Sequence, residues 1–190
     1  MILSFKTKFE DQTQTQFVRR IWDGLLLNGL ATQEQFQEYS QKWNWWWWSI
    51  PVEEDWEKEA YAKIHTIRHD PHDRWKAGRP IHFTINNRRP DRLQFAPVVP
   101  CVSVQNIRIE KELMSATAIA KSWNIKKFHV WIDGQPYGNP SRYGYDEDIV
   151  EYISQHDGFR FDSQFMNWWP EGTFEGKIIH WTNFRYDANY

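Results

Sequence analysis

The first part of the chain combines one short apolar run with two segments of helical spacing. Residues 2–6 (ILSFK) predict an opening strand. In the segment 13–29, apolar side chains recur at the spacing of one helix face, at Phe17, Ile21, Trp22 and Leu25. Gly29 follows them and is suited to end a helix there. Thr32 and Gln35 have capping-box spacing, which predicts that a second helix begins there. Pro51 ends or interrupts that helix, and the acidic segment 52–62 predicts one or two further helical turns.

From residue 63 onward, alternating apolar and polar positions predict several strands. They cover residues 63–68, 81–87 and 98–112, and a polar turn over 69–80 separates the first two. A further strand with Phe128, Val130 and Ile132 on one face ends at an Asp133-Gly134 turn. Two short helices over 146–159 and 160–169 and a strand over 176–186 close the chain.

This order of elements predicts an α+β protein. We expect one domain over residues 1–190, built as a small mixed β-barrel with flanking helices. A Trp-rich helical insertion at about 30–62 departs from the strand pattern.

Charge and cysteine content narrow the possible functions. The chain has 23 Lys and Arg against 25 Asp and Glu, a net charge of −2, which argues against a non-specific nucleic-acid coat protein but permits a local basic groove. The single cysteine, Cys101, permits no internal disulfide. No apolar run approaches the roughly 18 residues needed to span a bilayer. We therefore expect a cytoplasmic protein with no membrane partner.

Aromatic residues are abundant, with 13 Trp, 12 Phe and 8 Tyr. Four consecutive tryptophans within 43–48 (WNWWWW) cannot all face one side of a helix or strand. Trp45 and Trp46 are therefore candidates for stacking a base beside a cleft. A dimer contact and packing of the insertion onto the barrel are the alternatives. Trp168 and Trp169 are more typical of core or helix-end packing.

Several segments together resemble the ASCH domain, a branch of the PUA-like superfamily of small β-barrels. They are KIHTIR (63–68), RWKAGRPIHF (74–83), CVSVQNIRI (101–109), ISQHDGF (153–159) and GKIIHWT (176–182), in this order. The resemblance implies a PUA-like barrel with a cleft that binds RNA or a modified base. Some members of the family are similar to amidohydrolases that act on N4-acetylcytidine.

The resemblance also implies roles for individual residues. In the amidohydrolase branch a K-x-x-T-x-R segment and a later carboxylate carry catalysis, which correspond here to Lys63, Thr66, Arg68 and Asp157. The family carboxylate is a glutamate, so Asp157 is one methylene shorter. Residues 30–62 are inserted before the lysine, so we expect a rebuilt entrance to the cleft.

These residue types are suited to acyl transfer. Thr66 would attack the amide, Lys63 would take the proton, and Asp157 would orient the lysine. Arg68 or a backbone N–H would stabilise the oxyanion, and we assign His65 and Arg68 to ligand contact. Because residues 63 and 66 face opposite sides of a regular strand, catalysis requires a bend between them. The alternative is an ordinary edge strand with solvated charges.

Two further clusters lie in and beside the polar turn. His65, His69 and His72 invite a metal interpretation, but their spacing matches no well-attested zinc site, and we expect neither a metal nor a cofactor. Arg74 and Trp75 belong to a basic, aromatic stretch suited to phosphate contact and base stacking; a solvated surface with Trp75 in the core is equally compatible.

The sequence thus predicts a protein that binds RNA, a modified nucleoside or a small nucleotide ligand. Hydrolysis of an N-acylated cytidine-type amide is a further activity that the family resemblance implies. The alternatives are a non-catalytic protein that binds or sequesters small nucleotides, and a protein-interaction module that uses its tryptophans. The oligomeric state is left open.

Overall fold

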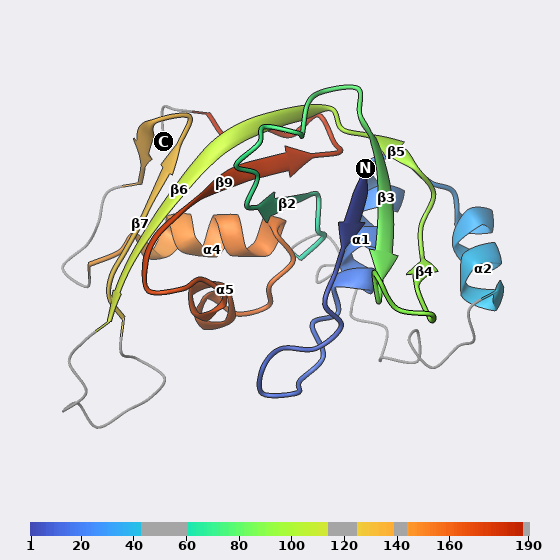
Figure 1. Ribbon diagram of the computed structural model, residues 1–190, viewed down its shortest axis with the longest axis horizontal. Helices are drawn as coiled ribbons and strands as arrows, with labels where there is room; N and C mark the ends of the chain where they lie inside the picture. Colours follow the sequence, from blue (N-terminus) through green and yellow to red (C-terminus); the bar gives the residue numbers. More distant parts are fainter. Residues whose placement is uncertain (43–60, 114–124, 139–143, 188–190) are drawn as a thin grey trace.

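Two β-sheets with helices packed against them make up the protein in a computed structural model, which describes residues 1–42, 61–113, 125–138 and 144–187 (Figure 1). In the smaller sheet the strand order is β1-β3-β4, and β5 also pairs with β3; the bounds are β1 Ile2–Ser4, β3 Pro80–Ile85, β4 Leu93–Gln94 and β5 Val99–Pro100. In the larger sheet the order is β2-β9-β6-β7-β8; the bounds are β2 His65–Arg68, β6 Ser103–Leu113, β7 Ile125–Ile132, β8 Gln135–Tyr137 and β9 Gly172–His180.

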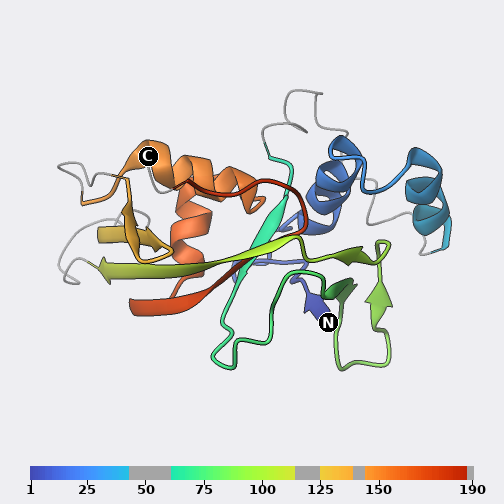
Figure 2. The same cartoon turned by 90° about the horizontal axis from the view of Figure 1, so that it is seen from above.

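Four helices lie within the described residues. They are α1 (Phe17–Leu27), α2 (Gln33–Lys42), α4 (Glu147–His156) and α5 (Asp162–Trp168). In Figure 1, α4 and α5 lie beneath the larger sheet, whereas α1 lies behind β1 and β3. Seen from above, β6 and β9 run alongside each other through the middle of the molecule (Figure 2). The mixed α+β class is confirmed.

The local sequence determines where α1 ends and where α2 begins. Gly29 has a φ of +64°, and the N–H groups of Gly29 and Leu30 donate to the carbonyls of Leu26 and Leu25, which is a Schellman motif. The Thr32 N–H donates to Gln35 Oε1, and the Gln35 N–H donates to Thr32 Oγ1. The predicted glycine end and the predicted capping box are therefore confirmed.

The predicted turn at Asp133-Gly134 joins β7 to β8. Both residues have positive φ, +50° and +81°, as a tight turn between antiparallel strands requires. Phe128, Val130 and Ile132 are all buried, as the alternation in β7 predicted.

The strand predicted over 98–112 is divided into β5 and β6 because the chain changes partners there. The Cys101 N–H donates to the carbonyl of Arg79 beside β3, whereas the Val102 N–H donates to that of His180 in β9. The two sheets diverge at this point. The strands of the described residues do not close into a barrel, so the expected barrel is not confirmed.

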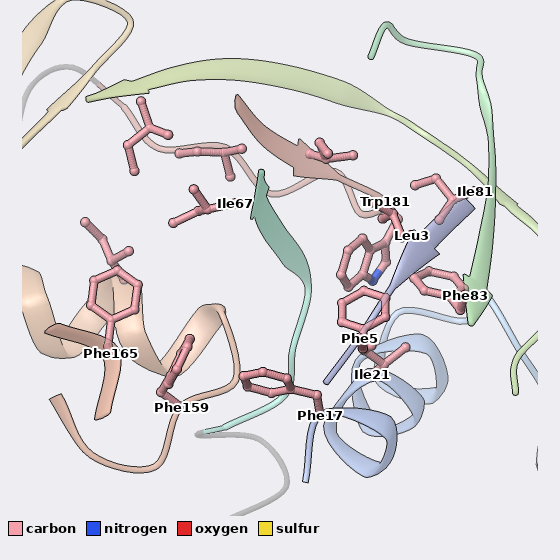
Figure 3. Packing of buried hydrophobic residues seen from close by; sticks show 14 of the residues in the cluster. Leu3, Phe5, Phe17, Ile21, Ile67, Ile81, Phe83, Phe159, Phe165 and Trp181 are labelled. Atoms are coloured by element: carbon pink, nitrogen blue, oxygen red, sulfur yellow. The ribbon is translucent and has the colours of Figure 1, made fainter. Parts of the chain in front are cut away.

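One hydrophobic core runs between both sheets and the helices. Figure 3 shows part of it, with Phe5, Phe83 and Trp181 on one side and Phe159 and Phe165 on the other. Among the described residues, no helix has the length and apolar character to cross a membrane. Of the insertion at 30–62, α2 is described, whereas Trp45 and Trp46 lie outside the described residues.

Candidate functional site

Lys63 lies just before β2, where the chain passes between α1 and the end of α4. Its backbone N–H donates to the carbonyl of Arg20 in α1 at 2.9 Å, and the next N–H, of Ile64, donates to that of His156 at 3.1 Å. Gly24 makes this approach possible, because a Cβ there would lie 2.4 Å from the carbonyl oxygen of Lys63.

The side chain of Lys63 is enclosed by the residues that end α4. Gly158 has a φ of +77°, and a Cβ there would lie 2.9 Å from the Cβ of Lys63. The Nζ of Lys63 donates to both the carboxylate and the main-chain carbonyl of Asp157. It also lies 4.8 Å from the centre of the Phe17 ring. The side chains of Lys63 and Asp157 are only 2% and 5% exposed, so this is a buried ion pair.

Burial and mutual attraction act in opposite directions on this pair. Burial lowers the pKa of Lys63 from 10.5 to about 8, although the Asp157 carboxylate opposes the shift. Burial by itself would raise the pKa of Asp157, but Lys63 and His65 outweigh it and hold that pKa below its usual range. A pKa of about 8 leaves roughly one-tenth of Lys63 neutral at pH 7.

His65 joins this pair to an aromatic cluster. Its Nε2 lies 2.7 Å from the hydroxyl of Tyr186, and its Nδ1 lies 3.6 Å from Oδ1 of Asp157, too far for a hydrogen bond. His180 is the cross-strand neighbour of His65, and within the described residues neither of its ring nitrogens has a hydrogen-bond partner. Burial lowers the pKa of His65 to about 4 and that of His180 to about 2, so both rings are neutral at pH 7.

Thr66 and Arg68 extend from the other face of β2. Arg68 donates to the carbonyl of Ser4 in β1 at 2.8 Å, and its guanidinium lies 5.0 Å from the centre of the Phe5 ring. Thr66 is buried and makes no side-chain hydrogen bond with Lys63 or Asp157. The structure therefore brings Lys63, His65 and Asp157 together but does not bring the Thr66 hydroxyl into hydrogen-bond reach of them.

The basic stretch after β2 lies away from this pair. Arg74 is exposed and forms an ion pair with Asp70 at 3.4 Å, whereas Trp75 is buried in the hydrophobic core. The backbone N–H of Trp75 donates to the same carboxylate at 2.8 Å. In this position Trp75 has a packing role and has no exposed ring face for a base.

Within the described part of the chain, no group of three or more His, Cys, Asp or Glu side chains is placed to hold a metal ion. His69 lies beside Phe174, and His72 is exposed, so the three histidines predicted as a possible set do not converge.

Three contributors to this site were not identified from the sequence. Gly24 offered a signal, because a glycine inside a helix costs about 1 kcal/mol relative to alanine and is typical of close backbone approach. Gly158 also offered a signal, because a glycine that follows a helix is typical of a helix end. Tyr186 gave no signal, since its contact with His65 joins residues that are 121 positions apart.

Comparison with protein-family models, with curated proteins and with solved structures finds no match for this chain.

Proposed function

We propose that the chain is an ASCH/PUA-like protein that binds a modified nucleoside or a nucleotide beside the Lys63–Asp157 pair and hydrolyses an N-acylated cytidine-type amide. The contact between Lys63 and Asp157 carries the proposal. The two residues are 94 positions apart, and the family resemblance selected both of them from the sequence. Burial gives Lys63 a pKa of about 8, close to the value that a general base requires.

In the proposed reaction, neutral Lys63 takes the proton of the Thr66 hydroxyl as its oxygen attacks the amide carbon. The tetrahedral intermediate collapses, the C–N bond breaks, and Lys63 returns the proton to the cytidine amino group. Lys63 then takes a proton from water as the water oxygen attacks the threonine ester. The acyl–oxygen bond breaks, the acid is released, and Lys63 returns the proton to the Thr66 oxygen. Asp157 positions the lysine throughout.

Thr66 has to approach Lys63 for this reaction to occur. Lys63 and Thr66 are 1% and 3% exposed, so substrate entry requires movement of the side chains that cover them. The same burial favours a second candidate function, a protein that binds nucleotides without catalysis and in which Lys63–Asp157 stabilises the fold.

The test is incubation with N4-acetylcytidine, with chromatography to detect cytidine. We expect turnover by the native chain, with kcat/KM rising as the pH rises through about 8, because Lys63 must lose its proton. Thr66→Val removes the hydroxyl but keeps the β-branched shape, so we expect at least a hundredfold loss of kcat/KM.

Thr66→Ser is the matched control, because it keeps a hydroxyl at the same position and should retain most of the activity. Turnover that Thr66→Val leaves unchanged contradicts the role of the threonine. Nucleotide binding without any turnover supports the non-catalytic function.

A further inference from the structure

A groove separate from the buried pair lies between the segment Lys6–Asp11 and the helix α5. Its volume is about 560 Å³, within the range of small-molecule sites. Both walls belong to the described residues. The groove is adjacent to the candidate site, since the Phe17 ring lies 5.8 Å from Trp168 and 4.8 Å from Lys63 Nζ.

An aromatic surface forms one part of this groove. Trp168 is half-buried, and its inner contacts are edge-to-face with Phe9 at 5.9 Å and with Phe159 at 5.7 Å. These rings hold the indole in place. The ammonium of Lys6 lies 4.9 Å from the indole centre. A rigid, partly exposed indole is suited to stack on a planar ligand.

Side-chain amides lie beside the indole. Gln164, Asn167 and Trp168 are three and four positions apart in α5 and therefore share one side of that helix. No side-chain hydrogen bond joins either amide to another residue in the described ranges. Amides can donate and accept together, which matches the edge of a nucleobase.

Carboxylates distinguish this groove from a phosphate site. Glu10 and Asp11 line it together with a single lysine, Lys6, which leaves an excess of one negative charge. The Asp11 carboxylate accepts hydrogen bonds from the backbone N–H and the hydroxyl of Thr13, and these contacts hold its pKa below the usual range. Such a rim repels a phosphate and accepts hydrogen bonds from an amino group.

We infer that this groove binds the base of an uncharged nucleoside, with Trp168 stacking on the ring, Gln164 and Asn167 contacting its edge, and the carboxylates disfavouring 5′-phosphates. The ligand class rests on the proposed function, and this inference narrows that class from a modified nucleoside or a nucleotide to an uncharged nucleoside. The position of the site rests on the groove itself.

The experiment is calorimetric titration of the full chain with cytidine and with cytidine 5′-monophosphate. We expect cytidine to bind more tightly than the monophosphate. We expect the double substitution Gln164→Ala and Asn167→Ala, which lies on the surface, to raise the Kd for cytidine at least tenfold. Glu10→Gln should bring the Kd of the monophosphate closer to that of cytidine.

Gln155→Ala, on the neighbouring helix α4 and outside the groove, is the matched control and should leave both Kd values unchanged. Cytidine binding that the double substitution does not weaken overturns the groove assignment and leaves the proposed function standing. Cytidine binding that depends on these amides, without hydrolysis of N4-acetylcytidine, supports the groove and counts against the proposed reaction. A wild-type chain that does not bind cytidine, or that binds the monophosphate more tightly, overturns the inference.

Discussion

Lys63 keeps an ammonium ion inside the protein because two oxygens of Asp157 replace its water. An unpaired charge at this depth costs several kcal/mol, so neither partner is stable there without the other. The pair also binds two distant segments together, since Lys63 precedes β2 and Asp157 follows α4. A pair of this kind can be functional, structural or both, and its energetics can be measured directly.

At this scale we predict that Lys63→Met lowers the free energy of unfolding by about 3–5 kcal/mol, because it leaves the Asp157 carboxylate buried without a partner. The double variant Lys63→Met with Asp157→Leu should recover most of that loss, because apolar side chains of similar size need no partner. Urea denaturation of the single and double variants measures the coupling.

The surface pair of Lys76 and Asp73 provides the control. Their side chains are 64% and 62% exposed, so Lys76→Met should change stability by less than about 1 kcal/mol. The two residues are not coupled if the double variant loses as much free energy of unfolding as the Lys63→Met and Asp157→Leu variants lose together.

Two glycines, one in α1 and one directly after α4, let these helices pack closely against Lys63. Gly24 allows α1 to approach the backbone of Lys63, and Gly158 turns the chain at the end of α4 against the lysine stem. The Arg20 side chain, which extends from α1, donates to the carbonyl of Gly158 at 2.6 Å. The close approach inside α1 and the turn after α4 therefore fix the geometry of the site.

For the end of α4 we predict that Gly158→Ala destabilises the protein by about 1–3 kcal/mol more than Gly78→Ala does. Both glycines have similar φ values, +77° and +82°, so the backbone strain is comparable. An added Cβ meets the Lys63 side chain only at Gly158, whereas open space surrounds Gly78. Equal losses in thermal or urea denaturation would indicate that the contact with Lys63 relaxes freely.

At the scale of the whole molecule, the response to acid depends on two buried imidazoles. They lie on the neighbouring strands β2 and β9 of the larger sheet. His65 and His180 are register partners, with ring centres 5.4 Å apart. Burial keeps both neutral, so acid must charge two adjacent groups in the interior.

We therefore predict that stability falls as the pH is lowered from about 6.5 to 4. The pKa values of His65 and His180 are lowered from 6.5 to about 4 and about 2, so in this window the unfolded chain binds protons that the folded protein excludes. The expected slope is about 1.4 kcal/mol per pH unit for each imidazole. Urea denaturation at a series of pH values measures it.

His180→Phe should reduce this slope, because it removes one titrating group whose nitrogens have no hydrogen-bond partner in the described part of the chain. His72→Gln, at an exposed imidazole, is the control and should leave the slope unchanged. A slope that His180→Phe does not alter would contradict the assignment to this pair.

Most of the elements could be predicted from the sequence because their causes are local. The Schellman glycine at Gly29, the capping box at Thr32 and the turn at Asp133-Gly134 depend on residues within a few positions of one another. The alternation in β7 likewise shows which face is buried. Local steric and hydrogen-bonding rules act in the same way wherever such a segment lies in a fold.

The tertiary structure decided the arrangement of sheets and the composition of the site. The partner change at Cys101 and Val102, which divides one predicted strand, depends on β3 and β9, about 20 and 80 residues away along the chain. The contact of His65 with Tyr186 likewise depends on the path that the chain takes after β9. The sequence by itself determined residue types, periodicities and caps; only packing determined which distant side chains meet, because contacts across the fold depend on all the elements together.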